Sequence, residues 1–361
     1  MNFYIPLVLI GVLLVITMLL ILLDKVMGGG GEKTITINEQ TQIPVMGDDT
    51  LLQTLNQEKI FIPSACGGKA TCGMCKFRLV EGGDGEVRPT ELPFLNEQER
   101  ADGVRLSCQV KVRGDMKIEI PEALLNAKEY HTVVDQIEDL TYDIKLVRFR
   151  LNEGDSIDFK PGQYAQIRVP GIEVIRAYSM ASNPKEKGSL EMIIRMVPNG
   201  QATTFVHKAL EVGDKITVTG PFGHFYLQED SDRDMICIAG GSGKAPIRSI
   251  MLYLKDRGMP RKVKYFFGAR TTKDLYYTEE FVELAKEFPN FEYIPALSDP
   301  QPDENWEGEV GLITDVVDRM TGDLSEAEAY LCGSPGMINA CTNILKKHNI
   351  ATERVFYDKF S

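Results

Sequence analysis

Three cysteines lie within ten residues of one another in the segment SACGGKATCGMC, which covers residues 64–75. Five residues separate Cys66 from Cys72, two separate Cys72 from Cys75, and Cys108 follows after a further 32. Four such thiolates can converge on an iron–sulfur cluster, because glycines let the loop bend tightly and present its N–H groups to the sulfides. Zinc sites usually have two paired knuckles, whereas Cys108 has no second cysteine nearby. The spacing predicts a [2Fe–2S] cluster, although plant-type proteins have four residues in the first interval.

A second group of polar residues follows in RAYSMAS, residues 176–182, which we expect on a strand. Alternation places Arg176 and Tyr178 on one side of that strand and turns Ser179 to the other, unless the strand ends there. An arginine suits a pyrophosphate, a tyrosine ring can stack on a planar cofactor, and a hydroxyl can hydrogen-bond a ring nitrogen. The simpler interpretation is a polar strand face.

Two glycine-containing turns open predicted helices. Gly200 and Thr203 begin an apolar-periodic helix that runs to residue 210, and the free amides of a helix N-terminus bind anions. The second turn, GGSGKAP at residues 240–246, follows the apolar strand MICIA and differs from the fingerprint GxGxxG because its last position is proline. Its glycines still let a phosphate-bearing ligand approach, and Pro246 can open the helix. A tight structural turn is the simpler interpretation.

Cys332 and Gly333 lie in CGSPGM, at the end of a later predicted strand. Open α/β sheets bind their ligands at this edge of the strands. A lone buried cysteine at such a place is ordinarily a core residue, so its assignment depends on the motifs that accompany it.

Residues 3–23, FYIPLVLIGVLLVITMLLILL, form a run of 21 residues without a charge. As a helix this run reaches roughly 30 Å, the hydrocarbon thickness of a bilayer. A cleaved signal peptide is the alternative, but the run lacks a basic leading region and a small-residue cleavage site. We therefore expect a single uncleaved transmembrane helix, followed by a glycine-rich linker at 24–32. Because Lys25 and Lys33 follow the span, the positive-inside rule places the catalytic domains in the cytoplasm.

The rest of the chain divides into three predicted domains, at residues 33–125, 126–229 and 230–361. The first combines short strands with one helix and is typical of a small α+β domain. The second has short strands bounded by turn signals, which predicts an antiparallel β-barrel. The third alternates strands with helices, as in an α/β doubly wound nucleotide-binding domain. The expected strands are 34–37, 76–80, 106–112, 116–120, 142–151, 163–169, 190–197, 215–219, 235–239, 263–267, 292–297 and 329–332. The expected helices are 50–58, 200–210, 246–257, 279–288 and 335–348.

The composition excludes other functions. The net charge is −12 and no block of basic residues occurs, which excludes a nucleic-acid partner. The four histidines are scattered without an HExxH motif, so no histidine metal site is expected. The seven cysteines are clustered in a large chain, which favours metal ligation in a reducing compartment over a disulfide framework.

Together these motifs resemble the ferredoxin–NAD(P)H reductase superfamily with a fused [2Fe–2S] domain. The resemblance covers essentially the whole chain in order: anchor, cysteine domain, flavin domain and nucleotide domain. It implies a β-grasp ferredoxin domain, an FAD-binding barrel and an NADH-binding domain, and the five-residue gap between Cys66 and Cys72 suits this family. The motifs that carry it are CGGKATCGMC, RLSCQV, RAYSMA, GPFG, FGAR, ALSDP followed by NW, and CGSPGM.

The resemblance implies a role for each candidate residue. The cluster ligands are Cys66, Cys72, Cys75 and Cys108. The FAD-binding residues are Arg176 at the pyrophosphate, Tyr178 on the flavin, Ser179 near its reactive N5, and Gly200 and Thr203 at a second pyrophosphate turn. The NADH-binding residues are Gly241, Gly243, Pro246, Arg270 near the adenosine, and Gly333. The implied catalytic residues are Ser179, Cys332 in the nicotinamide pocket, and Phe360 over the flavin, with Phe356 and Tyr357 as other candidates for that covering ring.

The implied function is electron transfer from NADH through FAD and the [2Fe–2S] cluster to a membrane acceptor. A flavin is needed because NADH gives two electrons whereas the cluster takes one. The resemblance implies the electron-input component of a sodium-pumping NADH:quinone oxidoreductase-like complex, single-pass in the inner (plasma) membrane, with other membrane redox subunits as partners. The chain departs from that family in its short connection at 163–175 and in its ending, YDKFS.

Two alternatives remain from the sequence. The reductase component of an oxygenase, or another standalone ferredoxin-type NADH reductase, uses the same three modules, but such reductases are mostly soluble. A membrane-tethered electron carrier with a degenerate flavin site is the other, although the RAYS and CG motifs are intact.

Overall fold

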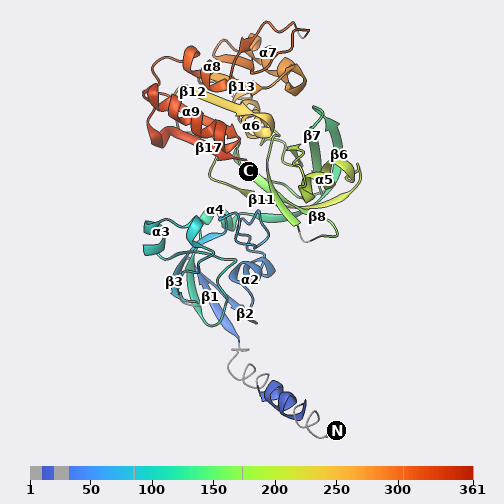
Figure 1. Ribbon diagram of the computed structural model, residues 1–361, viewed down its shortest axis with the longest axis vertical. Helices are drawn as coiled ribbons and strands as arrows, with labels where there is room; N and C mark the ends of the chain where they lie inside the picture. Colours follow the sequence, from blue (N-terminus) through green and yellow to red (C-terminus); the bar gives the residue numbers. More distant parts are fainter. Residues whose placement is uncertain (1–9, 20–31, 84–85, 173, 304, 361) are drawn as a thin grey trace, which may run out of the picture. The chain divides into compact units, whose positions relative to one another are not determined.

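The computed structural model describes residues 10–19, 32–83, 86–172, 174–303 and 305–360, which belong to two compact units, Met1–Lys128 and Glu129–Ser361 (Figure 1). Residues 10–19 are helical. Within the described ranges no helix is long and apolar enough to cross a membrane. The expected span at 3–23 and the linker at 24–32 lie largely outside these ranges.

The first unit contains one mixed five-stranded sheet in the order β2-β1-β5-β3-β4, with β1 and β5 parallel. Helix α2 begins with a capping box, in which the Thr50 side chain accepts from the backbone N–H of Gln53. Its apolar face and the sheet enclose one hydrophobic core. The elements are β1 Lys33–Ile37, β2 Thr41–Val45, α2 Leu51–Gln57, β3 Lys76–Gly82, η1 Leu92–Phe94, α3 Glu97–Ala101, β4 Val104–Leu106, β5 Met116–Glu119 and α4 Glu122–Leu125.

The expected strand at 106–112 is wrong, because β4 already ends at Leu106. The following residues instead bond to the segment that leads into α2. The backbone N–H of Leu51 donates to the carbonyl of Val110 at 2.8 Å, and that of Val112 donates to the carbonyl of Asp49 at 3.0 Å. Cys108 therefore lies on a loop rather than within a ladder.

The second unit begins with a six-stranded sheet in the order β10-β7-β6-β11-β8-β9, in which β10 and β7, β7 and β6, β11 and β8, and β8 and β9 pair antiparallel. An isolated antiparallel bridge between Met180 and Met192 links its two edges and closes a barrel. The long strand β6 was not expected from the sequence. The elements are β6 Lys128–Asp139, β7 Ile144–Leu151, β8 Tyr164–Val169, β9 Val174–Ser179, β10 Ser189–Arg195, α5 Gln201–Lys208 and β11 Lys215–Phe222.

The remaining residues form a parallel six-stranded sheet in the order β15-β14-β13-β12-β16-β17. Helices α6 and α7 pack on one face of it, and α8 and α9 pack on the other. The elements are β12 Met235–Gly240, η2 Gly241–Gly243, α6 Lys244–Lys255, β13 Val263–Ala269, η3 Thr272–Asp274, α7 Thr278–Glu287, β14 Phe291–Leu297, β15 Glu309–Val310, α8 Ile313–Met320, β16 Glu328–Gly333, α9 Pro335–Lys347, η4 Thr352–Arg354 and β17 Val355–Lys359.

The strand order of this sheet reverses at β12. Strands β13, β14 and β15 follow on one side of it, and β16 and β17 follow on the other. Doubly wound sheets bind their ligands at the carboxyl ends of the strands beside such a reversal. Here those ends carry Gly240–Gly243 and Cys332–Gly333, two of the motifs singled out above.

Helix α6 begins at Lys244, two residues before the expected start at Pro246. Proline fits the first turn because the N–H that it lacks would have no helical partner there. The same helix joins the barrel to the sheet. Arg248 donates to the carbonyl of Ala181 at 3.1 Å and to Glu191 at 2.9 Å, and the Ser249 hydroxyl donates to the carbonyl of Ser182 at 2.7 Å.

Candidate functional site

The four expected cluster cysteines come together as two pairs. The thiol of Cys72 donates to Cys66, with 3.4 Å between the sulfurs. The thiol of Cys75 donates to Cys108, and both of these side chains are buried. In the described part of the chain, no group of three or more His, Cys, Asp or Glu side chains is arranged to hold a single metal ion. Two pairs of thiols fit a two-iron core in which each iron takes two thiolates.

The cysteine loop has the backbone that such a core requires. Gly67, Gly68, Ala70 and Gly73 have positive φ angles, which turn the chain tightly around the thiols. Backbone N–H groups of the loop hydrogen-bond to three of the four sulfurs. Amides directed at sulfur stabilise bound iron–sulfur clusters and tune their potential. The donor set and the loop therefore both fit a [2Fe–2S] cluster.

In each pair of thiols, the pKa of one is lowered and the pKa of the other is raised. Burial raises the pKa of Cys66, but the Thr71 backbone N–H and hydroxyl and the Cys72 thiol outweigh it and lower the pKa to about 6. The hydrogen bond from Cys75 lowers the pKa of Cys108 to about 7 against the effect of burial. The pKa of Cys75 is raised by that same hydrogen bond, and the pKa of Cys72 is raised by burial. One thiol of each pair thus approaches the thiolate form that binds iron.

A buried ion pair supports the strand that leads to Cys108. Glu91 is 0% exposed and Arg105 is 3% exposed, and the guanidinium donates to the carboxylate at 2.8 Å. The same carboxylate accepts the backbone N–H of Leu106 at 2.8 Å. Burial opposes ionisation of Glu91, but the hydrogen bonds from Arg105 and from the backbone dominate and lower its pKa.

We expect Glu91→Gln to lower the free energy of unfolding of the first unit by about 3–5 kcal/mol, because it leaves the guanidinium buried without its counter-charge. Urea unfolding followed by the visible absorbance of the cluster measures the loss. Since the folded-state pKa of Glu91 is lowered, its stabilisation is present above the ordinary value of 4.5 and is lost as pH falls through the folded pKa. In the variant, the free energy of unfolding should therefore fall less steeply as the pH is lowered below 4.5.

The control for this prediction is Glu81→Gln in the same unit. Glu81 pairs with Lys117 in a bridge whose two side chains are 66% and 53% exposed, so its loss should change the free energy of unfolding by less than about 1 kcal/mol. Equal losses in the two variants would show that the buried pair has no special role.

Three of the five residues expected to bind FAD, Arg176, Tyr178 and Ser179, lie on β9, which ends at Ser179. Arg176 is exposed, and its guanidinium donates to the carbonyl of Ile175 at 2.8 Å. Tyr178 packs against the barrel core, and burial raises its pKa to about 12. Ser179 is 6% exposed and lies opposite Tyr164 of β8. The strand thus presents a cation and a phenol on one side and a hydroxyl at its end.

Gly200 and Thr203 form the turn that begins α5. The Thr203 hydroxyl accepts the backbone N–H of Val197 at 3.1 Å and lies 3.2 Å from the carbonyl of Gly200. A Cβ at Gly200 would come within 2.6 Å of that hydroxyl. Both residues therefore shape the turn that presents the N-terminus of the helix.

At the carboxyl edge of the parallel sheet lies a cavity of about 240 Å³, whose lining includes Gly241 and Arg270. Gly241 has a φ of +55°. Gly243 lies behind it, and a Cβ there would come within 2.2 Å of the carbonyl oxygen of Cys332. The glycine turn and the end of β16 thus approach each other more closely than any side chain would allow. Pro246 is buried in α6 beneath them.

Sequence reasoning missed Arg195, which extends from the barrel strand β10 to line the same cavity. Its guanidinium donates to Asp143 at 2.7 Å and lies 3.3 Å from the place where Gly241 would carry a Cβ. Arg270 also pairs with a carboxylate, that of Asp299, at 3.2 Å. The available signal was an arginine at the end of the strand SLEMIIR, but only the fold brings it to the carboxyl edge of the parallel sheet.

The C-terminal strand β17, also not expected, lies parallel to β16 and brings the tail to this edge. Cys332 is fully buried opposite Asp358, and its sulfur accepts the Asp358 backbone N–H. Burial raises the pKa of the Asp358 carboxyl to about 6. The backbone N–H of Phe360 donates to the carbonyl of Gly333 at 2.9 Å.

The three aromatic candidates for the covering ring have different surroundings. Phe356 stacks on Tyr330, with 5.2 Å between the ring centroids, and packs against the core. Tyr357 is 50% exposed. Of the three, Phe360 is the residue whose backbone N–H donates to Gly333 at the carboxyl edge of the parallel sheet.

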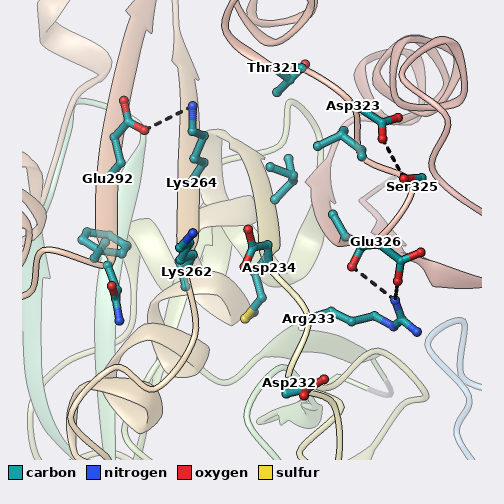
Figure 2. Close-up of a pocket in the computed structure, with 18 of the residues that line it drawn as sticks. Asp232, Arg233, Asp234, Lys262, Lys264, Glu292, Thr321, Asp323, Ser325 and Glu326 are labelled. Carbon is teal, nitrogen blue, oxygen red and sulfur yellow. Dashed lines mark hydrogen bonds and ion pairs between the residues drawn. The ribbon is translucent and has the colours of Figure 1, made fainter.

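A larger cavity, about 740 Å³, lies at the opposite, amino edge of the sheet, and Figure 2 shows its charged lining. Lys264 pairs there with Glu292 at 3.4 Å, and Arg233 pairs with Glu326 at 2.7 Å. The lining contains none of the residues that the sequence predicts to bind a cofactor or to take part in catalysis. The size of a cavity alone would therefore point away from the usual site of a doubly wound sheet, whose ligands bind at the carboxyl edge.

Three family models match the chain in order. Residues 35–113 match the 2Fe-2S iron-sulfur cluster binding domain. Residues 131–226 match the oxidoreductase FAD-binding domain, and residues 237–343 match the oxidoreductase NAD-binding domain. The first match covers most of the five-stranded sheet and the thiol pairs, the second covers most of the barrel, and the third covers most of the parallel sheet.

Curated relatives match over nearly the full length. The F subunit of the Na(+)-translocating NADH-quinone reductase of Neisseria meningitidis is 35% identical, over 97% of this chain and 96% of that protein. The corresponding protein of Pseudomonas aeruginosa is 37% identical, over 91% of each. The first alignment covers 394 positions, more than the 361 residues of this chain, so the relative has insertions that this chain lacks.

Solved structures have a similar fold over most of the chain. The Amycolatopsis cytochrome P450 reductase GcoB superimposes with a TM-score of 0.75 at 29% identity, over 91% of this chain and 98% of that one. A ferredoxin reductase in carbazole 1,9a-dioxygenase superimposes with a TM-score of 0.70 at 26% identity, over 92% and 99%. The similarity in fold therefore extends to reductases of oxygenases.

Proposed function

This chain belongs to the family of the F subunits of Na(+)-translocating NADH-quinone reductases, and from that premise we propose the residues through which it oxidises NADH. It is an NADH oxidoreductase with FAD and a [2Fe–2S] cluster as cofactors. Electrons pass from NADH to FAD, then to the cluster, and on towards quinone. The alternative as an oxygenase reductase is not better supported, since the curated relatives described above carry the NADH-quinone reductase name over nearly the whole chain.

The observation that carries the proposal is the arrangement of four thiols as two pairs on a loop rich in positive-φ residues. We assign Cys66, Cys72, Cys75 and Cys108 as the cluster ligands. When bound, FAD would supply a group that can take two electrons as hydride and give them up singly, and the residues assigned below would hold it. The protein therefore has to bind, orient and shield these groups.

For FAD, we assign Arg176 and the turn of Gly200 and Thr203 to the pyrophosphate. The exposed guanidinium supplies the positive charge, and the start of α5 supplies free amides. We assign Tyr178 and Ser179 to the flavin ring, because one presents an aromatic face and the other a hydroxyl at the end of the same strand.

For NADH, we assign the carboxyl edge of the parallel sheet as the binding site. Its cavity contains two cations, Arg195 and Arg270, that suit a dinucleotide phosphate, beside a glycine turn that permits close approach. We assign the nicotinamide end to Cys332 and Phe360. The NADH-binding residues assigned from the sequence are Gly241, Gly243, Pro246, Arg270 and Gly333.

We further propose that residues 3–23 anchor the chain in the inner (plasma) membrane by a single pass, with 24–32 as a linker and the catalytic domains in the cytoplasm. The uncharged run and the lysines that follow it support this topology. We propose functional boundaries at 33–125, 126–229 and 230–361. The partners are other membrane redox subunits, one of which receives the electrons.

The test compares the full chain with a variant that lacks residues 1–32. We expect the full chain, purified in mild detergent, to be yellow-brown, to bleach with NADH and to resist extraction from membranes by alkaline carbonate. The shortened chain should be soluble and should still reduce ferricyanide with NADH at a rate within about twofold, because its catalytic residues are unchanged. A shortened chain that stays in the membrane would refute the anchor, and a colourless chain that binds only zinc would refute the redox function.

A further inference from the structure

The side chain of Lys244 is fully buried at the start of α6, directly after the glycine turn. Its ammonium lies 3.7 Å from the centroid of the Phe267 ring and 5.1 Å from that of Phe281. It donates to the carbonyl of Tyr276 at 2.6 Å and to the hydroxyl of Tyr293 at 3.1 Å. Lysine is almost never fully buried unless it is paired, so this arrangement requires an explanation.

No carboxylate pairs with this ammonium in the parts of the chain that the structure describes. A neighbouring ion pair joins Arg248 to Glu280 at 3.1 Å, between α6 and α7. Burial lowers the pKa of Lys244, with an opposing effect from Glu280 and a reinforcing one from Arg248. An apolar side chain such as methionine would fill an aromatic pocket without this desolvation. What lysine adds is its two directed hydrogen bonds.

The hydrogen bond to Tyr276 leads to the nucleotide cavity. Lys244 holds the backbone of Tyr276, just before Tyr277, which has a positive φ of 52° at the start of α7. The hydroxyl of Tyr276 in turn donates to the carbonyl of Gly241 at 2.8 Å. Gly241 has a positive φ and lines the cavity together with Arg195. The ammonium is therefore connected to the ligand-facing turn through one residue.

We propose that Lys244 is a positioning residue for NADH, which fixes the turn at Gly241 through the backbone and the hydroxyl of Tyr276. The proposal rests on the function proposed above and extends it to a residue that does not touch the dinucleotide. Without the hydrogen bond from Lys244 to Tyr276, or the one from Tyr276 to Gly241, the turn can adopt conformations that do not accept the phosphates. The affinity for NADH then falls, while the chemistry of bound NADH is unchanged.

The test uses the full-length holoprotein in detergent and four variants: Lys244→Met, Tyr276→Phe, the two combined, and Lys255→Met. Lys255 ends the same helix, and its side chain is 45% exposed, which makes it the matched control. Isothermal titration with ADP-ribose gives the Kd, and NADH-dependent ferricyanide reduction gives KM and kcat. FAD and iron contents report whether each variant is folded and loaded.

We expect each single variant to weaken ADP-ribose binding and to raise the KM for NADH about tenfold, with kcat changed less than about twofold. The combined variant should have about the same Kd and KM as the single variant that binds more weakly, because both substitutions break the same connection between Lys244 and Gly241. Lys255→Met should match the unmodified chain. Multiplicative effects in the combined variant, or unchanged affinity in the two single ones, would overturn the proposal.

If Lys244→Met does not fold, Tyr276→Phe decides, because it removes the bond to Gly241 and leaves the lysine pocket intact. An unchanged Kd in that variant overturns the proposal, and a weakened Kd supports it. Failure of the unmodified chain to bind ADP-ribose would instead refute the nucleotide site itself, and the role of Lys244 with it.

Discussion

Cys108→Ala should yield a protein that retains its flavin and its NADH oxidation but contains almost no iron. One of four thiolates would be missing, and the remaining three cannot complete two pairs around a two-iron core. Quinone reduction by membranes that contain the variant should fall at least ~100-fold, whereas NADH-dependent ferricyanide reduction should stay within about twofold. The first unit has a hydrophobic core of its own, so the loss should be confined to that unit.

The matched control for this substitution is Cys341→Ala. Cys341 is also a fully buried free cysteine, but it lies in α9 against the core of the nucleotide-binding sheet. Its removal should lower stability by about 1–3 kcal/mol and leave iron, visible absorbance and the electron paramagnetic resonance signal unchanged. Full iron content in Cys108→Ala would refute the assignment of the fourth ligand.

Gly243→Ala should abolish NADH oxidation at ordinary substrate concentrations while FAD and iron remain bound. The added Cβ would lie 2.2 Å from the carbonyl oxygen of Cys332 and 3.0 Å from the backbone N of Gly333. Both are backbone atoms within the sheet, so the turn or strand β16 must move. We expect kcat/KM for NADH to fall at least ~100-fold, with a loss of about 1–3 kcal/mol in stability from overpacking.

Gly336→Ala is the control, because a Cβ at that position would meet no atom within 4 Å. It lies in the first turn of α9, where alanine should stabilise the helix slightly. Stopped-flow reduction of the flavin by NADH separates the two variants. Equal rates for Gly243→Ala and Gly336→Ala would show that the close contact between turn and strand has no part in nucleotide binding.

Much of the parallel sheet was predictable because its strands are buried on both faces and read as continuous apolar runs such as MICIA. Helix α8 was missed although Ile313, Val316, Val317 and Met320 have helical spacing. Strand β6 was missed for a better reason. Its charged residues face outwards, and only Tyr130, Thr132 and Val134 are buried. So few buried positions in a strand of 12 residues are recognised as a strand only when the neighbouring strands are known.

The candidate site was predictable where chemistry is local. Cys66, Cys72 and Cys75 lie in one loop, and the glycine turn is a second short motif, so local spacing was enough to group these residues. Arg195 and Lys244 were not predictable, because their places depend on contacts across the fold. An arginine that ends a barrel strand and a lysine that begins a helix are both ordinary surface residues by sequence, and packing alone brings one to the cavity and buries the other.

The hydrophobic core that the barrel and the parallel sheet share determines where this protein can be recombined. Ile144 and Phe225 of the barrel belong to the same buried cluster as Met235 and Tyr265 of the sheet. A chimera joined at residue 229 would split that cluster and leave two apolar faces in water. A chimera joined between Lys128 and Glu129 would separate complete units. The unit with the four cysteines can thus be exchanged by itself, whereas the barrel and the parallel sheet must be transferred together.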